Sequence, residues 1–227
     1  MANTQDRIKK NRIEKLFLAY FCLMFLINSN YSNAATFKTG KSNSLYVTGK
    51  LELGDEKLFS KALQHHANIS DIVFENCMGG ALQAGFYISQ EIKRRKLNTI
   101  VSRQCHSSCS YAFLAGQIKK FSDSNGVHML SLHATTATSG TFEEQEERNR
   151  ALIRYLSVLT GNKLPEKLKT LIFESRGPSR AVVFIARNYF FRGSEFETRY
   201  CNGTEKFNID KCEKIEYADV ATVGIIN

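Results

Sequence analysis

The sequence lacks an apolar run long enough to cross a bilayer, and it contains no internal repeat and no low-complexity tract. Its longest apolar run, Leu16–Ile27, has 12 residues, whereas a transmembrane helix needs about 20. Tryptophan is absent and only two prolines are present, and 43% of the 227 residues are hydrophobic while 23% are charged. This composition and length are those of a globular protein with one well-packed domain.

The first 34 residues have the features of a secretory signal peptide. Basic side chains outnumber acidic ones before the apolar run, and small residues precede Ala34. We expect cleavage after Ala34, a lead-in segment over residues 35–45, and an exported domain over residues 46–227 that is periplasmic or secreted. The alternative is an uncleaved segment that anchors the protein in the membrane, because the basic region is long for a signal peptide.

The sequence also lacks the dense basic surface of a nucleic-acid-binding protein. The formal net charge is +9, and removal of residues 1–34, which carry five bases and two acids, lowers it to +6. The one dense basic run, Lys93–Lys96, ends a predicted helix, where cations interact favourably with the helix dipole. We therefore expect no nucleic-acid partner.

Metal and haem motifs are absent as well. A c-type haem site requires Cys-x-x-Cys-His, but here His106 follows the first cysteine of the pair Cys105 and Cys109. No second pair of ligands with zinc spacing lies downstream. The sequence therefore predicts neither a metal nor a cofactor.

Export changes the interpretation of the cysteines. An oxidising compartment favours disulfides over free thiols, and five cysteines remain after residue 34. Cys201 and Cys212 flank a polar loop that a disulfide would close. Cys105 can pair with Cys109, but Cys77 competes for either partner, so the second bridge stays open.

Strands alternate with helices in the first part of the domain. Hydrophobic periodicity predicts a strand from Tyr46 and a helix after Gly54, then strands over residues 71–76, 98–102 and 128–133, with helices over residues 81–96 and 108–117. Short connections favour parallel pairing with right-handed crossovers. The segments CMGG, CHSSC and LHATT each follow a strand, and ligands bind at the carboxyl ends of strands in such sheets.

The second half of the sequence is predicted to be helical. Thr141 and Glu144 have capping-box spacing before a helix that ends at Gly161. Pro165 begins a second helix. Residues 178–191 are predicted as a third helix, apolar enough to be mostly buried.

A serine nucleophile fits the segment that follows the predicted strand over residues 98–102. Ser107 and Ser108 lie between a strand and a helix, where the free N–H groups of the helix N-terminus favour negative charge. Acyl transfer also needs a base and further donors for the oxyanion. His133 ends the predicted strand over residues 128–133. Gly79-Gly80 lets the backbone approach the substrate closely, so that it can supply a further donor. A cysteine nucleophile is disfavoured because export favours oxidised cysteines.

Three motifs occur in a fixed order and spacing. The segment GGALQAG begins at Gly79, the serine eight positions before Ala115 of an Ala-Gly pair is Ser107, and His133 follows Ser107 by 26 positions. The opening VTGKLELGDEKLF and the Cys-x-Ser-x-Cys frame around Ser107 accompany them. In these motifs, over about residues 46–135, the chain resembles the ClpP/crotonase-like superfamily, in particular its exported ClpP-like serine-protease branch.

The resemblance implies the fold and the roles of the site residues. It implies an α/β fold, a ClpP/crotonase-like spiral of repeated β-β-α units with parallel strand pairing, to which the helical pattern adds a helical C-terminal half. It implies Ser107 as the nucleophile, His133 as the general base, and the N–H groups of Gly80 and Ser108 as the oxyanion hole. Asn188 is the best match to the aspartate of the family, although an amide stabilises imidazolium less well than a carboxylate. A peptide or protein substrate, no cofactor and a homo-oligomer complete these expectations.

Two alternatives to an active serine peptidase remain. The first is a binding or scaffold protein of the cell envelope that keeps the fold with weak or no catalysis, which the missing aspartate favours. The second is a crotonase-type enzyme that uses only the oxyanion hole on a thioester. Export argues against the second, because acyl-CoA substrates are cytosolic, and such an enzyme has no need of a paired serine and histidine.

Overall fold

The structure is a computed structural model that describes residues 34–135, 140–177, 179–189, 193–205 and 208–227. Residues 1–33 of the predicted signal segment, 1–34, lie outside the described residues. Residues Ala34–Asn227 form one compact unit. Within the described ranges, no helix combines the length and the hydropathy needed to cross a membrane.

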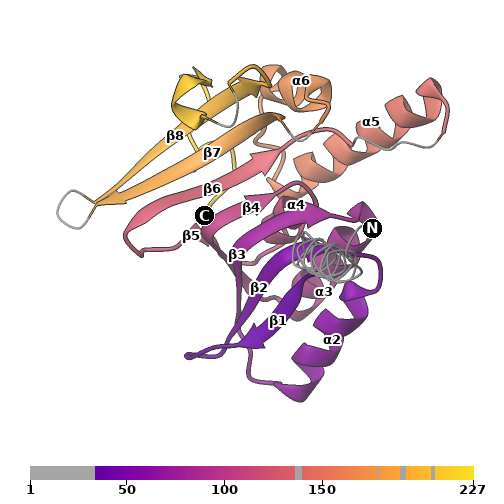
Figure 1. Ribbon diagram of the computed structural model, residues 1–227, viewed down its shortest axis with the longest axis vertical. Coiled ribbons are helices and arrows are strands. Elements are labelled where there is room, and N and C mark those ends of the chain that lie inside the picture. Colours follow the sequence, from indigo (N-terminus) through magenta and orange to yellow (C-terminus); the bar gives the residue numbers. More distant parts are fainter. Residues whose placement is uncertain (1–33, 136–139, 178, 190–192, 206–207) are drawn as a thin grey trace, which may run out of the picture. The chain divides into compact units, whose positions relative to one another are not determined.

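One mixed sheet runs through the described part of the chain, and it has nine strands (Figure 1). The order is β1-β2-β3-β4-β6-β7-β8-β9, and β5 pairs with β4. Strands β2, β3, β4 and β6 are parallel, whereas β1 and β7 to β9 pair antiparallel with their neighbours. The bounds are β1 Thr36–Thr39, β2 Ser44–Leu51, β3 Asp71–Gly80, β4 Asn98–His106, β5 Lys119–Phe121, β6 Gly126–Leu132, β7 Arg180–Tyr189, β8 Gly193–Asn202 and β9 Glu213–Lys214.

Helices cover one face of this sheet and form the main core with it. Phe59, Ile88 and Leu156, from three different helices, are fully buried in one cluster with Phe74 and Val101 of the strands. The helices are α2 Asp55–His65, α3 Leu82–Arg95, α4 Ser108–Leu114, α5 Phe142–Leu159 and α6 Glu166–Glu174, with a short 3-10 helix at Ile209–Lys211. Burial of these large apolar side chains is the main source of the fold's stability.

A smaller apolar cluster covers the opposite face of β7. It contains Ala181, Val183 and Ile185, against which Met129 and Ile209 pack. The segment that follows β8 therefore lies over the face of the sheet that the helices leave uncovered, and it helps to form the pocket described below.

The predicted start of α5 is confirmed. The Thr141 hydroxyl accepts a hydrogen bond from the Glu144 N–H at 3.2 Å, and the Glu144 carboxylate accepts one from the Thr141 N–H at 2.8 Å. This reciprocal capping box satisfies two N–H groups that a helix start otherwise leaves free. Pro165 immediately precedes α6. The N–H groups at a helix start have no intrahelical acceptor, so a proline, which has no N–H, loses no hydrogen bond there.

The prediction of a helical C-terminal half is not confirmed, because only α5 and α6 of its three expected helices are present. Residues 178–191, expected as a helix, contain strand β7, which pairs antiparallel with both β6 and β8. Figure 1 shows β7 and β8 as a long hairpin. The apolar run AVVFIA is buried on both faces because clusters on opposite sides of the sheet take alternate residues. In a short strand buried on both faces every residue is apolar, so the sequence shows neither the alternation of a strand nor the 3.6-residue period of a helix.

Two further expectations about the fold differ from the structure. The lead-in over residues 35–45 contains β1, which pairs with β2 and so is part of the sheet. The spiral of repeated β-β-α units is not confirmed, since from β2 to α4 single strands alternate with single helices. Parallel pairing of the central strands is confirmed.

Candidate active site

Parallel pairing brings the ends of β3, β4 and β6 to one edge of the sheet. Cys77 of β3 is the register partner of Cys105, and His106 at the end of β4 is the partner of Ser131 in β6. The next residue, Ser107, donates its N–H to the Ser131 carbonyl at 3.1 Å. Ser107 and the residues after β6 are therefore neighbours across a strand pair.

Ser107 occupies a strained turn between β4 and α4. Its backbone angles are φ 54° and ψ −124°, a region that residues other than glycine rarely adopt. A sharp strand-to-helix turn with a positive φ exposes the hydroxyl of the turn residue, as in the nucleophile elbow of hydrolases. Ser108, by contrast, is 1% exposed and its hydroxyl has no hydrogen-bond partner among the described residues. Of the two adjacent serines, Ser107 is therefore the one with the strained backbone and the more exposed side chain.

The turn is held from several sides. A disulfide joins Cys105 of β4 to Cys109 of α4, so it spans the turn. The Ser110 hydroxyl contacts the Cys105 carbonyl at 2.9 Å and the Ser131 carbonyl at 2.8 Å, and the Ser110 N–H donates to the Ser107 carbonyl at 2.8 Å. These contacts restrain a backbone that would otherwise relax to a less strained conformation.

Gly79 lies against the turn. A Cβ atom at this position would come within 2.7 Å of the Ser107 Cβ and 3.1 Å of the Ser108 nitrogen. Its φ of 71° is also one that a side chain would strain. Gly79 can lie beside Ser107 only because it carries no side chain, whereas a Cβ atom at Gly80 would meet Leu51 and Lys50 of β2. The roles of the Gly80 and Ser108 N–H groups as oxyanion donors stay predictions.

His133 follows β6 and is oriented by its own backbone. Its Nδ1 lies 2.6 Å from the carbonyl oxygen of Ala134. A carbonyl only accepts hydrogen bonds, so Nδ1 carries the proton and the Nε2 of the neutral ring keeps a free lone pair. Burial lowers the pKa of His133, and the bond to Ala134 opposes that shift in part. The neutral ring with the proton on Nδ1 is the form that a general base requires.

His106 lies in the same pocket but has both ring nitrogens occupied. Nδ1 is 2.6 Å from the Ser131 hydroxyl and Nε2 is 3.3 Å from the Gln104 side-chain oxygen. Burial, with a smaller contribution from the charge of His133, lowers the pKa of His106 to about 4. His106 is a half-buried histidine with a hydrogen bond to the neighbouring strand β6.

We expect acid to destabilise the fold through His106. The unfolded chain binds a proton at this residue near pH 6.5, whereas the folded protein does so only near pH 4. Between these values the unfolded state binds more protons, so the free energy of unfolding decreases as the pH is lowered, by up to about 3 kcal/mol for such a shift. Urea titrations from pH 7 to pH 4 should show a shallower loss for His106→Gln than for the wild type. Equal slopes would contradict this assignment.

Ser107, His106 and His133 line one pocket of about 340 Å³. The opposite wall is formed by apolar residues of β6, β7 and the segment after β8, among them Met129, Val183 and Ile209, together with Cys201 and Cys212. The second disulfide, Cys201–Cys212, is the one expected from the sequence. It closes the segment that forms this wall.

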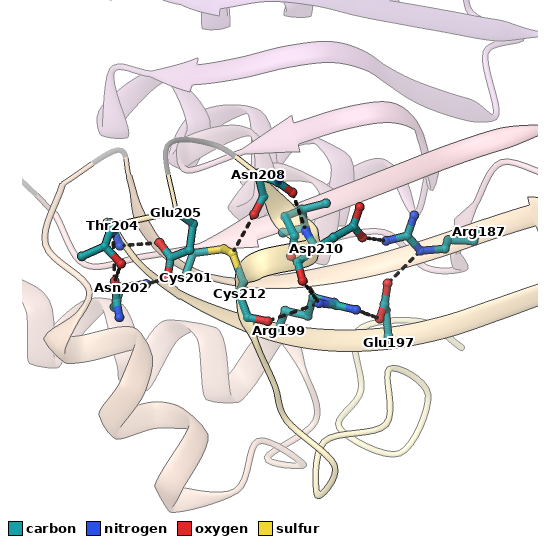
Figure 2. The surroundings of a disulfide bond; sticks show 12 residues. Arg187, Glu197, Arg199, Cys201, Asn202, Thr204, Glu205, Asn208, Asp210 and Cys212 are labelled. Atoms are coloured by element: carbon teal, nitrogen blue, oxygen red, sulfur yellow. Dashed lines mark hydrogen bonds and ion pairs between the residues drawn. A yellow bond between two sulfur atoms is a disulfide. The ribbon is translucent and has the colours of Figure 1, made fainter.

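Hydrogen bonds and ion pairs hold the disulfide-closed segment in place (Figure 2). Arg199 Nη1 donates to the carbonyls of Asp210 at 3.0 Å and Cys212 at 3.2 Å. Arg187 bridges Glu197 at 2.8 Å and Asp210 at 2.6 Å. The pocket wall is thus attached to β7 and β8.

Glu205 is the one acidic side chain that lines the pocket in the described residues. It accepts hydrogen bonds from the N–H groups of Asn202 and Gly203, each at 2.9 Å. These bonds, that from Asn202 foremost, lower the pKa of Glu205. The Glu205 carboxylate therefore stabilises the turn at residues 202–205 through these two hydrogen bonds.

The structure does not bring Asn188 to His133, which corrects the predicted triad. Asn188 pairs with Gly126 at the start of β6, six positions along β7 from Val182, the partner of Leu132. At about 3.3 Å per residue this separation is about 20 Å. The Asn188 amide donates instead to the carbonyl oxygens of Ser122 and Ser124. The prediction failed because it rested on a helix that is in fact a strand.

The partner of His133 Nδ1, the Ala134 carbonyl, was missed by the sequence analysis. Backbone carbonyls occur at every position, so no residue type marks this one. In the described part of the chain no hydrogen bond joins the Ser107 hydroxyl to the His133 ring, although both line the pocket. Such catalytic bonds are often long before substrate binds.

Cys77 is the free cysteine of the described residues and is buried beside the turn. Burial raises the pKa of its thiol to about 12. A protonated, buried thiol is unreactive, so the competition of Cys77 for Cys105 or Cys109 is resolved in favour of the Cys105–Cys109 bridge. The described residues contain no cluster of three metal-ligating side chains.

Comparisons with known proteins give structural neighbours only. No protein-family model matches the chain, and no curated protein matches its sequence. A ClpP1 mutant from Listeria monocytogenes is similar in structure, with 15% identity and a TM-score of 0.44 over 82% of this chain and 89% of that chain. A mutant of the 1510-N membrane-bound stomatin-specific protease has 12% identity and a TM-score of 0.39 over 56% of this chain and 65% of that chain. At these scores, the similarities give no residue of this chain a role.

Proposed function

We propose that the protein is a serine hydrolase that cleaves peptide bonds, with Ser107 as the nucleophile and His133 as the general base. The observation that carries this proposal is the backbone conformation of Ser107, a positive φ at a strand-to-helix turn. It is supported by His133, which lines the same pocket as Ser107 and whose Nε2 has no hydrogen-bond partner among the described residues.

In the proposed reaction, Ser107 attacks the carbonyl carbon of the substrate while His133 Nε2 removes the hydroxyl proton. The imidazolium then returns the proton to the leaving amine, and water hydrolyses the acyl-enzyme by the same relay. The N–H groups of Ser108 and Gly80 stabilise the oxyanion. Ser108 is the first residue of α4, so its N–H has no intrahelical acceptor.

The Ala134 carbonyl takes the place of the acidic member of a triad. It fixes the tautomer and the orientation of the His133 ring through the bond at 2.6 Å. A carbonyl dipole stabilises the imidazolium less than a carboxylate does, so we expect a slower enzyme than one with a full triad.

The pocket favours a substrate with an apolar side chain next to the reacting carbonyl. Its wall opposite Ser107 is built from methionine, valine and isoleucine side chains and the Cys201–Cys212 disulfide. The carboxylate of Glu205 already accepts two backbone N–H groups. We therefore expect no preference for a basic side chain.

Export to an oxidising compartment is part of the proposal. Two disulfides support it, since such bonds persist outside the reducing cytosol. The segment that would direct export precedes the described residues, so this point rests on the sequence pattern and the cysteines.

A fluorophosphonate probe tests the proposal directly, because it labels only activated serines. We expect labelling of the wild-type protein and none of Ser107→Ala. Ser108→Ala is the matched control, since it keeps the backbone N–H and should still be labelled. If the folded wild type is not labelled, or if Ser107→Ala is labelled equally, the hydrolase assignment fails and the catalytically weak binding protein of the cell envelope is the better description.

A further inference from the structure

We propose that Asn149 is a positioning residue of the active site, which holds His133 in its catalytic orientation through the peptide unit between Ala134 and Thr135. The inference rests on the proposed function, because it concerns the residue assigned there as the general base. It assigns a role in this site to α5, which lies outside the pocket.

The backbone that follows β6 is held at the first peptide unit from both sides. The His133 carbonyl accepts a hydrogen bond from the Tyr111 hydroxyl at 2.8 Å, and the Ala134 N–H donates to the Ser175 carbonyl at 2.8 Å. These two groups belong to one planar unit. Its orientation is therefore set by α4 on one side and by the end of α6 on the other.

The second peptide unit consists of the Ala134 carbonyl and the Thr135 N–H. The carbonyl accepts from His133 Nδ1 at 2.6 Å, and the N–H donates to Asn149 Oδ1 at 2.8 Å. In a trans peptide unit the C=O and N–H bonds are rigidly linked and point in opposite directions. The bond that Asn149 makes to the N–H therefore fixes the direction in which the carbonyl meets His133.

The amide of Asn149 has only one orientation that fits. Its Oδ1 also accepts the Thr135 hydroxyl at 2.6 Å, so two donors converge on one oxygen. A flipped amide would place its NH₂ group against both donors. The oxygen therefore faces Thr135.

If Asn149 only filled space in the core, an apolar side chain would be more stable at this position. Its side chain is 1% exposed, and Nδ2 has no hydrogen-bond partner among the described residues. An unsatisfied buried donor is destabilising, because it loses its hydrogen bonds to water and gains none in the fold. A leucine here would pack in the same volume without that cost, as Leu152 and Leu156 do on the same helix. The amide is explained by the hydrogen bonds that its oxygen accepts.

Loss of the acceptor should affect the chemical step and leave substrate binding nearly unchanged. Asn149 does not line the pocket, so the apolar wall stays as it is. Without it, the second peptide unit can rotate, the His133 ring loses its fixed partner, and Nε2 is misdirected. Outer groups that orient a catalytic histidine typically contribute about 10–100-fold.

The experiment compares Asn149→Leu with Asn188→Leu, a matched control. Both remove a buried asparagine, but Asn188 lies at the other end of the sheet. With a p-nitrophenyl ester of an apolar acyl group, we expect kcat of Asn149→Leu to fall about 10–100-fold with little change in KM. Asn188→Leu should keep both constants. Equal kcat values for Asn149→Leu and the wild type would overturn the inference.

A rescue separates positioning from packing. Asn149→Asp keeps an acceptor oxygen at the same distance along the side chain, so it should recover most of the lost kcat. If Asn149→Asp is as slow as Asn149→Leu, the acceptor is not what matters and the inference fails. Should Asn149→Leu not fold, Asn149→Ser replaces it, because serine is too short to reach the Thr135 N–H.

A measurement independent of turnover distinguishes failure of this inference from failure of the proposed function. NMR of ¹⁵N-labelled histidine reports the tautomer of each ring. We expect His133 to be protonated at Nδ1 in the wild type and in Asn188→Leu, and to become a mixture of tautomers in Asn149→Leu. An unchanged tautomer in Asn149→Leu overturns the inference whether or not the protein is a hydrolase. An unlabelled Ser107 with the expected tautomer change overturns only the proposed function.

Discussion

Replacement of His133 by alanine should lower kcat by about 10²–10⁴-fold, the usual contribution of a general base. The expectation follows from the hydrogen bonds of the two histidines in the pocket. His133 has Nδ1 bound to the Ala134 carbonyl and, within the described part of the chain, no partner at Nε2, whereas both nitrogens of His106 have partners. Only His133 can accept a proton from Ser107 without losing a bond.

The pH dependence provides a second measure of the same residue. Burial lowers the pKa of His133 below that of an ordinary histidine. We therefore expect the acid limb of the kcat/KM profile to lie at lower pH than an unshifted histidine would give. The ester assay used for Asn149 gives both the His133→Ala effect and this profile.

His128→Gln is the control for loss of a buried histidine. His128 lies on β6, the strand that His133 follows, and it does not line the pocket. Its ring accepts the Arg103 N–H at 3.0 Å and contacts the Ser124 carbonyl at 2.8 Å. It should cost stability and leave kcat within a few-fold. An equal loss of kcat in both variants would mean that His133 has a structural role.

Replacement of Phe184 by alanine should destabilise the protein by about 3–5 kcal/mol, as for large buried aromatics. Phe184 is fully buried in the main core at the centre of β7. Its neighbour Ile185 is fully buried in the cluster on the opposite face. Because adjacent residues of a strand point to opposite faces, Ile185→Ala should also be costly, at about 2–5 kcal/mol.

Equilibrium unfolding in urea measures both effects. Phe142→Ala is the matched control, since this side chain is 64% exposed on α5, and it should cost about 1 kcal/mol or less. A cost for Phe184→Ala no greater than that of the control would contradict the burial of β7 between two clusters. Retained fluorophosphonate labelling in the folded Ile185→Ala protein would show that the Ser107 turn tolerates this loss.

The first half of the fold followed from sequence because its signals are local. Helices α2 and α3 have one apolar face, and strands β3, β4 and β6 are short apolar runs between glycine and polar segments. Such patterns decide secondary structure where one face of a helix is buried. The second half was less predictable because residues 181–186 of β7 are all apolar and are buried on both sides.

The candidate site, like the fold, was predicted from the sequence only in part. The spacing of Ser107, His133 and Gly79 placed all three at strand ends, and the structure brings Ser107 and His133 to one pocket and Gly79 against Ser107. Asn188 was placed from a sequence motif in a segment with the wrong predicted conformation. The actual partner of His133 is a carbonyl, which no side chain identifies.

The sequence by itself determined the components of this protein: the parallel strands, the adjacent serines between cysteines, and the cysteine pair that closes a polar loop. Local periodicity, caps and spacing are properties of neighbouring residues, so the sequence alone contains them. Only the tertiary structure decided which serine has the strained backbone, which cysteine stays free, and that Asn149 holds the peptide unit behind His133. These depend on contacts between segments far apart in the chain, which are set by how the elements pack.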